Sequence, residues 1–167
     1  MTRLFEEQPS LERALTTPLP APVVAPLAAP GLTGDAAFGL DLILEGFLLH
    51  HGNPRLLRLP DDDRILAGDF CYAQGLVRVA EAGDLRIIRE LADLIALSTS
   101  LVATDDAGRL PALWRSVVAS IADHDEAHDR RLAAAKTALR STSDHSSLEE
   151  LAGSLPPTPT LDEVFDA

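Results

Sequence analysis

The stretch Ile65–Val102, ILAGDFCYAQGLVRVAEAGDLRIIRELADLIALSTSLV, is the hydrophobic centre of the chain and decides its fold class. Two apolar segments with helical spacing meet in it at Gly83. In the first segment Asp69 is the single charge before Arg78. A helix that is apolar on nearly every side is expected to be buried nearly all round.

Spacing within both segments supports helices. Gly68 and Gly75 lie seven residues apart on one face of the first segment, where another helix could approach closely. The second segment places four charged residues at i, i+3, i+4 and i+7, namely Arg86, Arg89, Glu90 and Asp93. This pattern predicts an amphipathic helix whose charged stripe faces water.

The composition favours packed helices. A chain of 167 residues is long enough for one domain with a sizeable core and too short for two comfortable ones. Apolar residues make up 46% of the chain and aromatic residues only 4%, and no window shows the alternation of a strand. We therefore predict an all-α fold, a helical bundle.

The chain divides into three parts by composition. Residues 1–33 are expected to form a short helix over 3–16 and then a Pro-rich segment that acts as a linker or a wrapping arm, because five prolines favour extended conformation. Residues 34–140 are expected to form the helical domain. Residues 141–167 are rich in Ser, Thr, Pro and acidic residues, which predicts a flexible acidic tail with a short helix at Leu148–Ala152 and a terminal peptide, 161–166, that is disordered until bound.

Charge and cysteine content limit the partners. The formal net charge is −12, which opposes binding to nucleic acid. The single cysteine, Cys71, excludes a disulfide framework, and prolines interrupt the one long uncharged span, so no membrane-spanning helix is expected. The N-terminus lacks the pattern of a secretory signal. A cytoplasmic protein is the expectation.

Two histidines are candidates for metal ligation. His124 and His128 are four residues apart in a helix that we expect from about Pro111 to Arg140, and this spacing lets two imidazoles share one ion. Two ligands do not make a metal site, and the surrounding residues are charged on every side. A solvated polar helix face is the favoured interpretation.

Residues 40–103 resemble the front half of the trans-type isoprenyl diphosphate synthases, all-α enzymes that join isopentenyl diphosphate to an allylic diphosphate. The resemblance rests on Gly52 and Pro54 in a G-x-P sequence, on the L-A-G-D-F-x-x-A run at Leu66–Ala73, and on the turn that follows at residues 81–84. It implies a partial isoprenoid-synthase-like fold.

In that family an Asp-Asp-x-x-Asp motif holds magnesium ions and two arginines before the G-x-P sequence bind phosphate. The matching positions here carry Asp41, Glu45, His50 and His51, with Asn53 next to the G-x-P glycine. Magnesium needs clustered oxygen ligands, and near-neutral histidine is a poor replacement for arginine on phosphate. The resemblance therefore implies five degenerate substrate-site positions and no catalytic residue.

Some bacterial long-chain prenyl diphosphate synthases pair a catalytic chain with a small helical subunit that lacks the aspartate motifs, and this chain resembles such a subunit. We predict that this chain is such a non-catalytic subunit, with a homologous catalytic synthase chain as its partner. It would need no cofactor itself, and Mg²⁺ is expected only in the partner. The predicted subunit contacts are Gly68, Phe70, Tyr72 and Gly75.

Two alternatives stay open. The chain could be a free-standing helical adaptor or cargo protein that binds through its Pro-rich arm and acidic tail. It could also be a working magnesium enzyme that uses Asp41, Glu45, His50 and His51.

Overall fold

The computed structural model describes residues 8–166, which form helices joined by turns and loops. The all-α prediction is confirmed. Outside the helices, the described residues show one isolated bridge, between Leu15 and Leu57. The helices are α1 (Pro9–Ala14), α2 (Val24–Ala28), α3 (Gly34–His51), α4 (Asp61–Glu81), α5 (Leu85–Ala103), α6 (Leu110–Ala122), α7 (Glu126–Thr142), α8 (Ser146–Gly153) and α9 (Pro159–Asp166).

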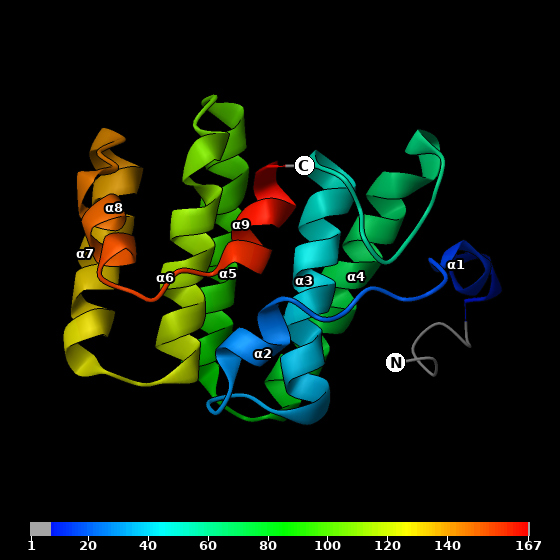
Figure 1. The fold of residues 1–167 in the computed structure, drawn as a ribbon, viewed down its shortest axis with the longest axis horizontal. Coiled ribbons are helices and arrows are strands. Elements are labelled where there is room, and N and C mark those ends of the chain that lie inside the picture. The colour runs from blue at the N-terminus through cyan, green and yellow to red at the C-terminus, as the bar shows by residue number, and fades with distance from the viewer. Residues whose placement is uncertain (1–7, 167) are drawn as a thin grey trace.

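Along the long axis of the molecule α1 lies at one end, followed by the pair α4 and α3, the pair α5 and α6, and finally α7 and α8 at the other end (Figure 1). α3 packs on α4, α5 on α6, and α7 on α8. The short helices α2 and α9 lie across the region between α3 and α6. None of the described helices combines the length and the apolar character needed to cross a membrane.

Helix α3 occupies the centre, and every residue from Gly39 to Leu49 is buried. We expected the first segment of Ile65–Val102, which forms most of α4, to be buried nearly all round, and this prediction is wrong. One face of α4 packs on α3, whereas Ile65, Leu66 and Val77 are 61%, 75% and 53% exposed. Periodicity identified an apolar helix, and it could not tell which of its faces the chain itself covers.

Glycines bring α3 and α4 into close contact. A Cβ atom on Gly75 would lie 2.6 Å from the carbonyl oxygen of Gly39, and one on Gly68 would lie 3.2 Å from the carbonyl oxygen of Gly46. The expected close helix approach is confirmed. Because α3 of the same chain fills this face, the prediction that Gly68 and Gly75 contact another subunit is wrong.

The other two predicted subunit contacts also face inward in part. The ring of Tyr72 covers Gly46 and stacks on His50, with ring centroids 5.5 Å apart and 12° between the planes. Phe70 is half-buried and packs against the smaller of two apolar clusters. Neither side chain is presented as a free contact surface.

The charged stripe of α5 meets other helices. Lys136 of α7 is 4% exposed, and its Nζ lies 2.8 Å from carboxylate oxygens of both Glu90 and Asp93. Arg86 donates to the carbonyl oxygen of Ser120 in α6 at 2.9 Å. Of the four residues only Arg89 is exposed, so the expectation of a stripe that faces water is wrong.

Both ends of the described chain belong to the fold. Val24 and Ala28 of the Pro-rich segment are 0% exposed, which makes it a packed arm, and α1 covers part of the helix expected over 3–16. In the segment expected to be a flexible tail, the short helix expected at Leu148–Ala152 is confirmed as α8, whereas the peptide expected to be disordered forms α9, with Leu161 0% exposed. Regular leucine spacing in this tail outweighs its polar composition. Residues 1–7 and 167 of these segments lie outside the described residues.

A small apolar cluster joins α1, α3 and α4 beside the main core. Its buried members are Leu42, Leu49, Leu56, Leu57, Ala67 and Cys71. The loop between α3 and α4 contributes two of these leucines, and Leu57 of this loop pairs with Leu15 in the bridge named above. The loop is therefore fixed on both sides.

Candidate functional site

Asp41 lies in the middle of α3 and is 3% exposed. Its Oδ1 accepts hydrogen bonds from the backbone N–H groups of Val23 at 2.7 Å and Val24 at 3.1 Å, and its Oδ2 accepts one from Ala25 at 2.9 Å. These donors include the first residues of α2, which have no partner inside that helix. Asp41 thus anchors the Pro-rich arm to the central helix.

Glu45 lies one turn further along the same face and is 1% exposed. Its Oε1 accepts from the backbone N–H groups of Leu56 and Leu57, both at 2.9 Å, and its Oε2 accepts from Arg55 at 2.8 Å. Burial raises the pKa of Glu45, and the three N–H groups lower it by less. The carboxylate fixes the loop that follows α3.

These two carboxylates sit at the positions that the synthase resemblance assigns to magnesium ligands. Magnesium requires several convergent oxygen atoms in near-octahedral order. Here the oxygens of Asp41 and Glu45 converge on six backbone N–H groups, three for each side chain, and these donors present positive hydrogens where a cation would have to sit. This geometry weighs against the magnesium-enzyme alternative.

His50 and His51 end α3 and line a hollow of about 410 Å³. The Nε2 atom of His50 lies 3.3 Å from Oδ1 of Asp69, and the ring of His51 lies 5.1 Å from that of Phe47. Burial, with a smaller contribution from His50, lowers the pKa of His51. His51 is therefore neutral at neutral pH and adds no fixed positive charge to the hollow.

Arg64, which sequence reasoning did not single out, is the fixed cation of this hollow. Its Nη2 donates to the carbonyl oxygen of Leu48 at 3.1 Å and also to that of Gly52, so the guanidinium satisfies the last carbonyl groups of α3. The C-terminal end of a helix carries partial negative charge. The site is therefore built to cap a helix and is poorly suited to a diphosphate.

Asn53 is exposed on the loop after α3. It lines a different hollow, of about 340 Å³, together with Arg55 and Glu163. The five predicted substrate-site positions are thus divided among two saturated carboxylates, the hollow at the end of α3 and this second hollow. They do not form one site.

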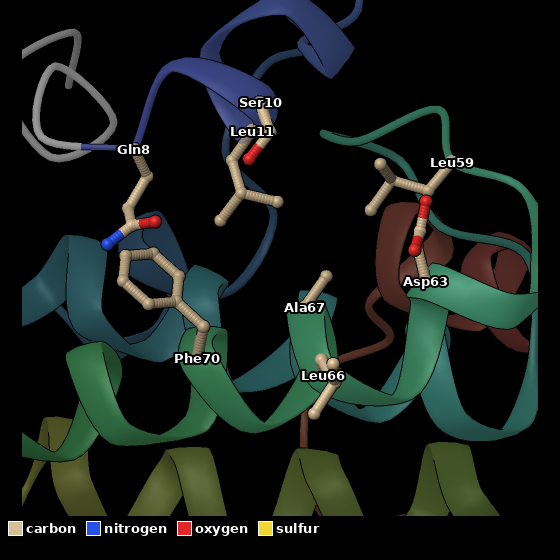
Figure 2. A pocket seen from close by; sticks show the side chains of 8 residues that line it. All are labelled: Gln8, Ser10, Leu11, Leu59, Asp63, Leu66, Ala67 and Phe70. Carbon is tan, nitrogen blue, oxygen red and sulfur yellow. The ribbon is translucent and has the colours of Figure 1, made fainter.

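Another hollow, of about 390 Å³, lies between α1 and the first half of α4 (Figure 2). Leu66, Ala67 and Phe70 of α4 form one wall, and Leu11 faces them from α1. Its polar side chains, including Asp63, lie around this apolar lining. None of the predicted substrate-site residues contributes to it.

His124 and His128 do not share a helix face. α6 ends at Ala122 and α7 begins at Glu126, so the expected continuous helix is interrupted. His124 contacts Asp129 at 2.5 Å, whereas His128 contacts the carbonyl oxygen of Ser116 at 2.8 Å. Within residues 8–166 no group of three side chains could hold a metal ion.

The feature that sequence reasoning missed is an exposed apolar surface on α4 and the start of α5. Four of the five large apolar side chains that are exposed within the described residues lie here, and Leu85 is 71% exposed. We call Ile65, Leu66, Val77 and Leu85 the α4–α5 face. The signal was present in the low charge of residues 65–77, and it was interpreted as burial within the chain's own core.

No family model matches the chain, and comparison with curated proteins and with solved structures also found no match.

Proposed function

We propose that this chain is a non-catalytic helical subunit that supports a catalytic polyprenyl diphosphate synthase chain in long-chain isoprenoid synthesis. The observation that carries the proposal is the backbone clamp at Asp41 and Glu45, since both carboxylates at the metal-ligand positions are saturated by N–H groups. A helical scaffold without a metal site fits a supporting role.

The α4–α5 face supports the need for a partner. Exposed large apolar side chains that are concentrated on one part of a soluble protein often mark an interaction site. Leu66 and Leu85 are the most exposed large apolar side chains on the face, at 75% and 71%. We place the contact with the catalytic chain here, in place of the glycine face that α3 occupies.

Packing of both ends of the described chain weighs against the adaptor alternative. It requires arm and tail to be available for binding, whereas Val24 and Leu161 are each 0% exposed inside the common core. Deletion of either end would remove core residues, so loss of binding after such a deletion would not distinguish an adaptor from an unfolded chain.

Co-purification with a polyprenyl synthase chain encoded beside this one tests the proposal. We expect a complex, and we expect synthase activity to rise when the chain is added. The variant Leu66→Glu should weaken the complex by about tenfold or more, because it places a charge in the centre of an apolar contact. Leu19→Glu is the matched control, since Leu19 is 39% exposed and lies outside the face.

Three results would overturn the proposal. They are the absence of a complex, synthase activity that does not change when the chain is present, and equal weakening by both variants. Turnover of an allylic diphosphate by the purified chain alone would instead revive the magnesium-enzyme alternative.

A further inference from the structure

The C-terminal helix α9 packs on α6 and reaches α3 through the contact of Phe165 with Phe47, and we call the surface that it covers the α3–α6 groove. Leu161 is 0% exposed, and the ring of Phe165 lies 6.0 Å from that of Phe47 and 5.8 Å from that of Trp114. Phe47 and Trp114 also face each other at 6.1 Å. The apolar floor of the groove is therefore held by the two long helices and does not depend on α9.

On one side of the groove, Arg115 binds a carboxylate. Nη2 of Arg115 lies 2.7 Å and 2.9 Å from the two oxygens of Asp162, and its Nε donates to Oγ1 of Thr158 at 3.1 Å. The planar guanidinium matches a carboxylate with directional, charge-assisted bonds. The groove thus recognises a short helix with a buried apolar residue, an acidic residue next to it, and an aromatic residue one turn later.

The attachment of α9 is slight. It has eight residues, which is too short to be stably helical in water, and Leu161 is its one fully buried residue. The chain reaches it from α8 through the exposed prolines Pro156 and Pro157 and crosses the front of α6 (Figure 1). Docking of α9 therefore depends on the same few contacts that an equivalent helix from another chain could make.

We propose that the α3–α6 groove is a binding site for a short acidic amphipathic helix supplied by a partner, and that α9 is its occupant within the chain. The partner helix carries apolar residues at i, i+3 and i+4, as Leu161, Val164 and Phe165 do, and a carboxylate at i+1 for Arg115. The affinity for the partner is reduced by the fraction of chains in which α9 is docked. This site is separate from the α4–α5 face and does not depend on the proposed function.

The test uses the full chain and a synthetic peptide of residues 156–166. A chain with Leu161→Ala and Phe165→Ala has a weakened internal occupant, and we expect it to bind the peptide more tightly than the wild-type chain by about tenfold or more. Trp114 is the single tryptophan of the chain, so its fluorescence reports occupancy. A peptide with Asp162→Arg should bind about tenfold or more weakly, and one with the exposed Glu163 changed to Gln should bind as the unchanged peptide does.

Exchanging the charges of Arg115 and Asp162 distinguishes specific binding in the groove from nonspecific apolar binding. The chain variant Arg115→Asp should reject the unchanged peptide and accept the Asp162→Arg peptide. Absence of peptide binding, equal binding by the two chains, or binding that ignores both charge changes overturns the proposal. If the double variant loses helix content by circular dichroism, the single full-chain variant Asp162→Arg replaces it. If this variant does not bind the unchanged peptide more tightly than the wild-type chain does, the proposal is also overturned.

Discussion

Substituting Asp41 by asparagine tests whether this carboxylate is a structural clamp. The carboxylate accepts three backbone N–H groups, from Val23, Val24 and Ala25, at a site that is 3% exposed. Asparagine has one oxygen and one NH₂ group, so at least one of the three donors must face another donor. The other two bonds also lose their charged acceptor.

The expected loss follows from these contacts. A buried donor without a partner costs about 1–3 kcal/mol, and the exchange of a charged for a neutral acceptor weakens each remaining bond by up to about 1 kcal/mol. We expect Asp41→Asn to lower the free energy of unfolding by about 2–4 kcal/mol. For a chain of this size such a loss corresponds to a fall of roughly 4–16 °C in Tm.

Urea denaturation followed by circular dichroism measures this loss, with thermal unfolding as a second measurement. The control is Asp123→Asn, because the side chain of Asp123 is exposed in the turn after α6, and its effect should stay within about 0.5 kcal/mol. If Asp41 were a metal-ligand position without a structural role, its replacement by asparagine would leave the free energy of unfolding unchanged or raise it. A loss below about 0.5 kcal/mol for Asp41→Asn would therefore refute the clamp and with it the main support for a non-catalytic chain.

Three further results are expected. Gly75→Ala should destabilise the chain by about 1–3 kcal/mol in urea denaturation, because its Cβ would lie 2.6 Å from a backbone oxygen, whereas Gly153→Ala should be neutral or slightly stabilising since nothing lies within 4 Å. Ser98→Ala should cost about 1–3 kcal/mol in the same assay, because Nε1–H of Trp114 donates to its Oγ at 3.1 Å. Burial raises the pKa of Glu45, so its contribution to stability should be complete below the ordinary glutamate pKa and be lost as pH rises through the raised pKa. Denaturation at a series of pH values should show this slope in wild type and not in Glu45→Gln.

Each of these has a contrary outcome. Equal effects of the two glycine substitutions would mean that the α3–α4 contact relaxes without cost. A neutral Ser98→Ala would mean that the indole finds another acceptor. A pH slope that persists in Glu45→Gln would assign the titration to a different group.

Local patterns predicted α4 and α5 and the close approach of another helix to α4. Helical spacing identified these two helices, and Gly83 has the positive φ of 81° that ends α4 before Asp84 caps α5, whereas α6 and α7 were expected as one helix and α9 as a disordered segment. Gly68 and Gly75 predicted a close helix approach because small residues on one helix face leave room for a neighbouring helix. These features depend on residues that are near each other in sequence.

The candidate site could not be predicted in this way. The donors for Asp41 are 16 to 18 residues before it, and those for Glu45 are 10 to 12 residues after it, in segments without regular spacing. Asp41 and Glu45 were therefore assigned to a degenerate substrate site, whereas both are buried and accept backbone N–H groups. The exposed face of α4 was missed for a related reason, since apolar periodicity records that a surface avoids water and does not record which chain covers it.

The single cysteine gives the native chain a built-in probe of local opening. Cys71 is 0% exposed in the small cluster shared by α1, α3 and α4, and burial, with a smaller contribution from Glu45, raises its pKa to about 12. A thiol reagent needs the thiolate and access to it, so labelling can proceed only when α4 separates from α3. Because Trp114 lies in the main core, labelling and fluorescence would time the opening of two different parts of one unmodified molecule.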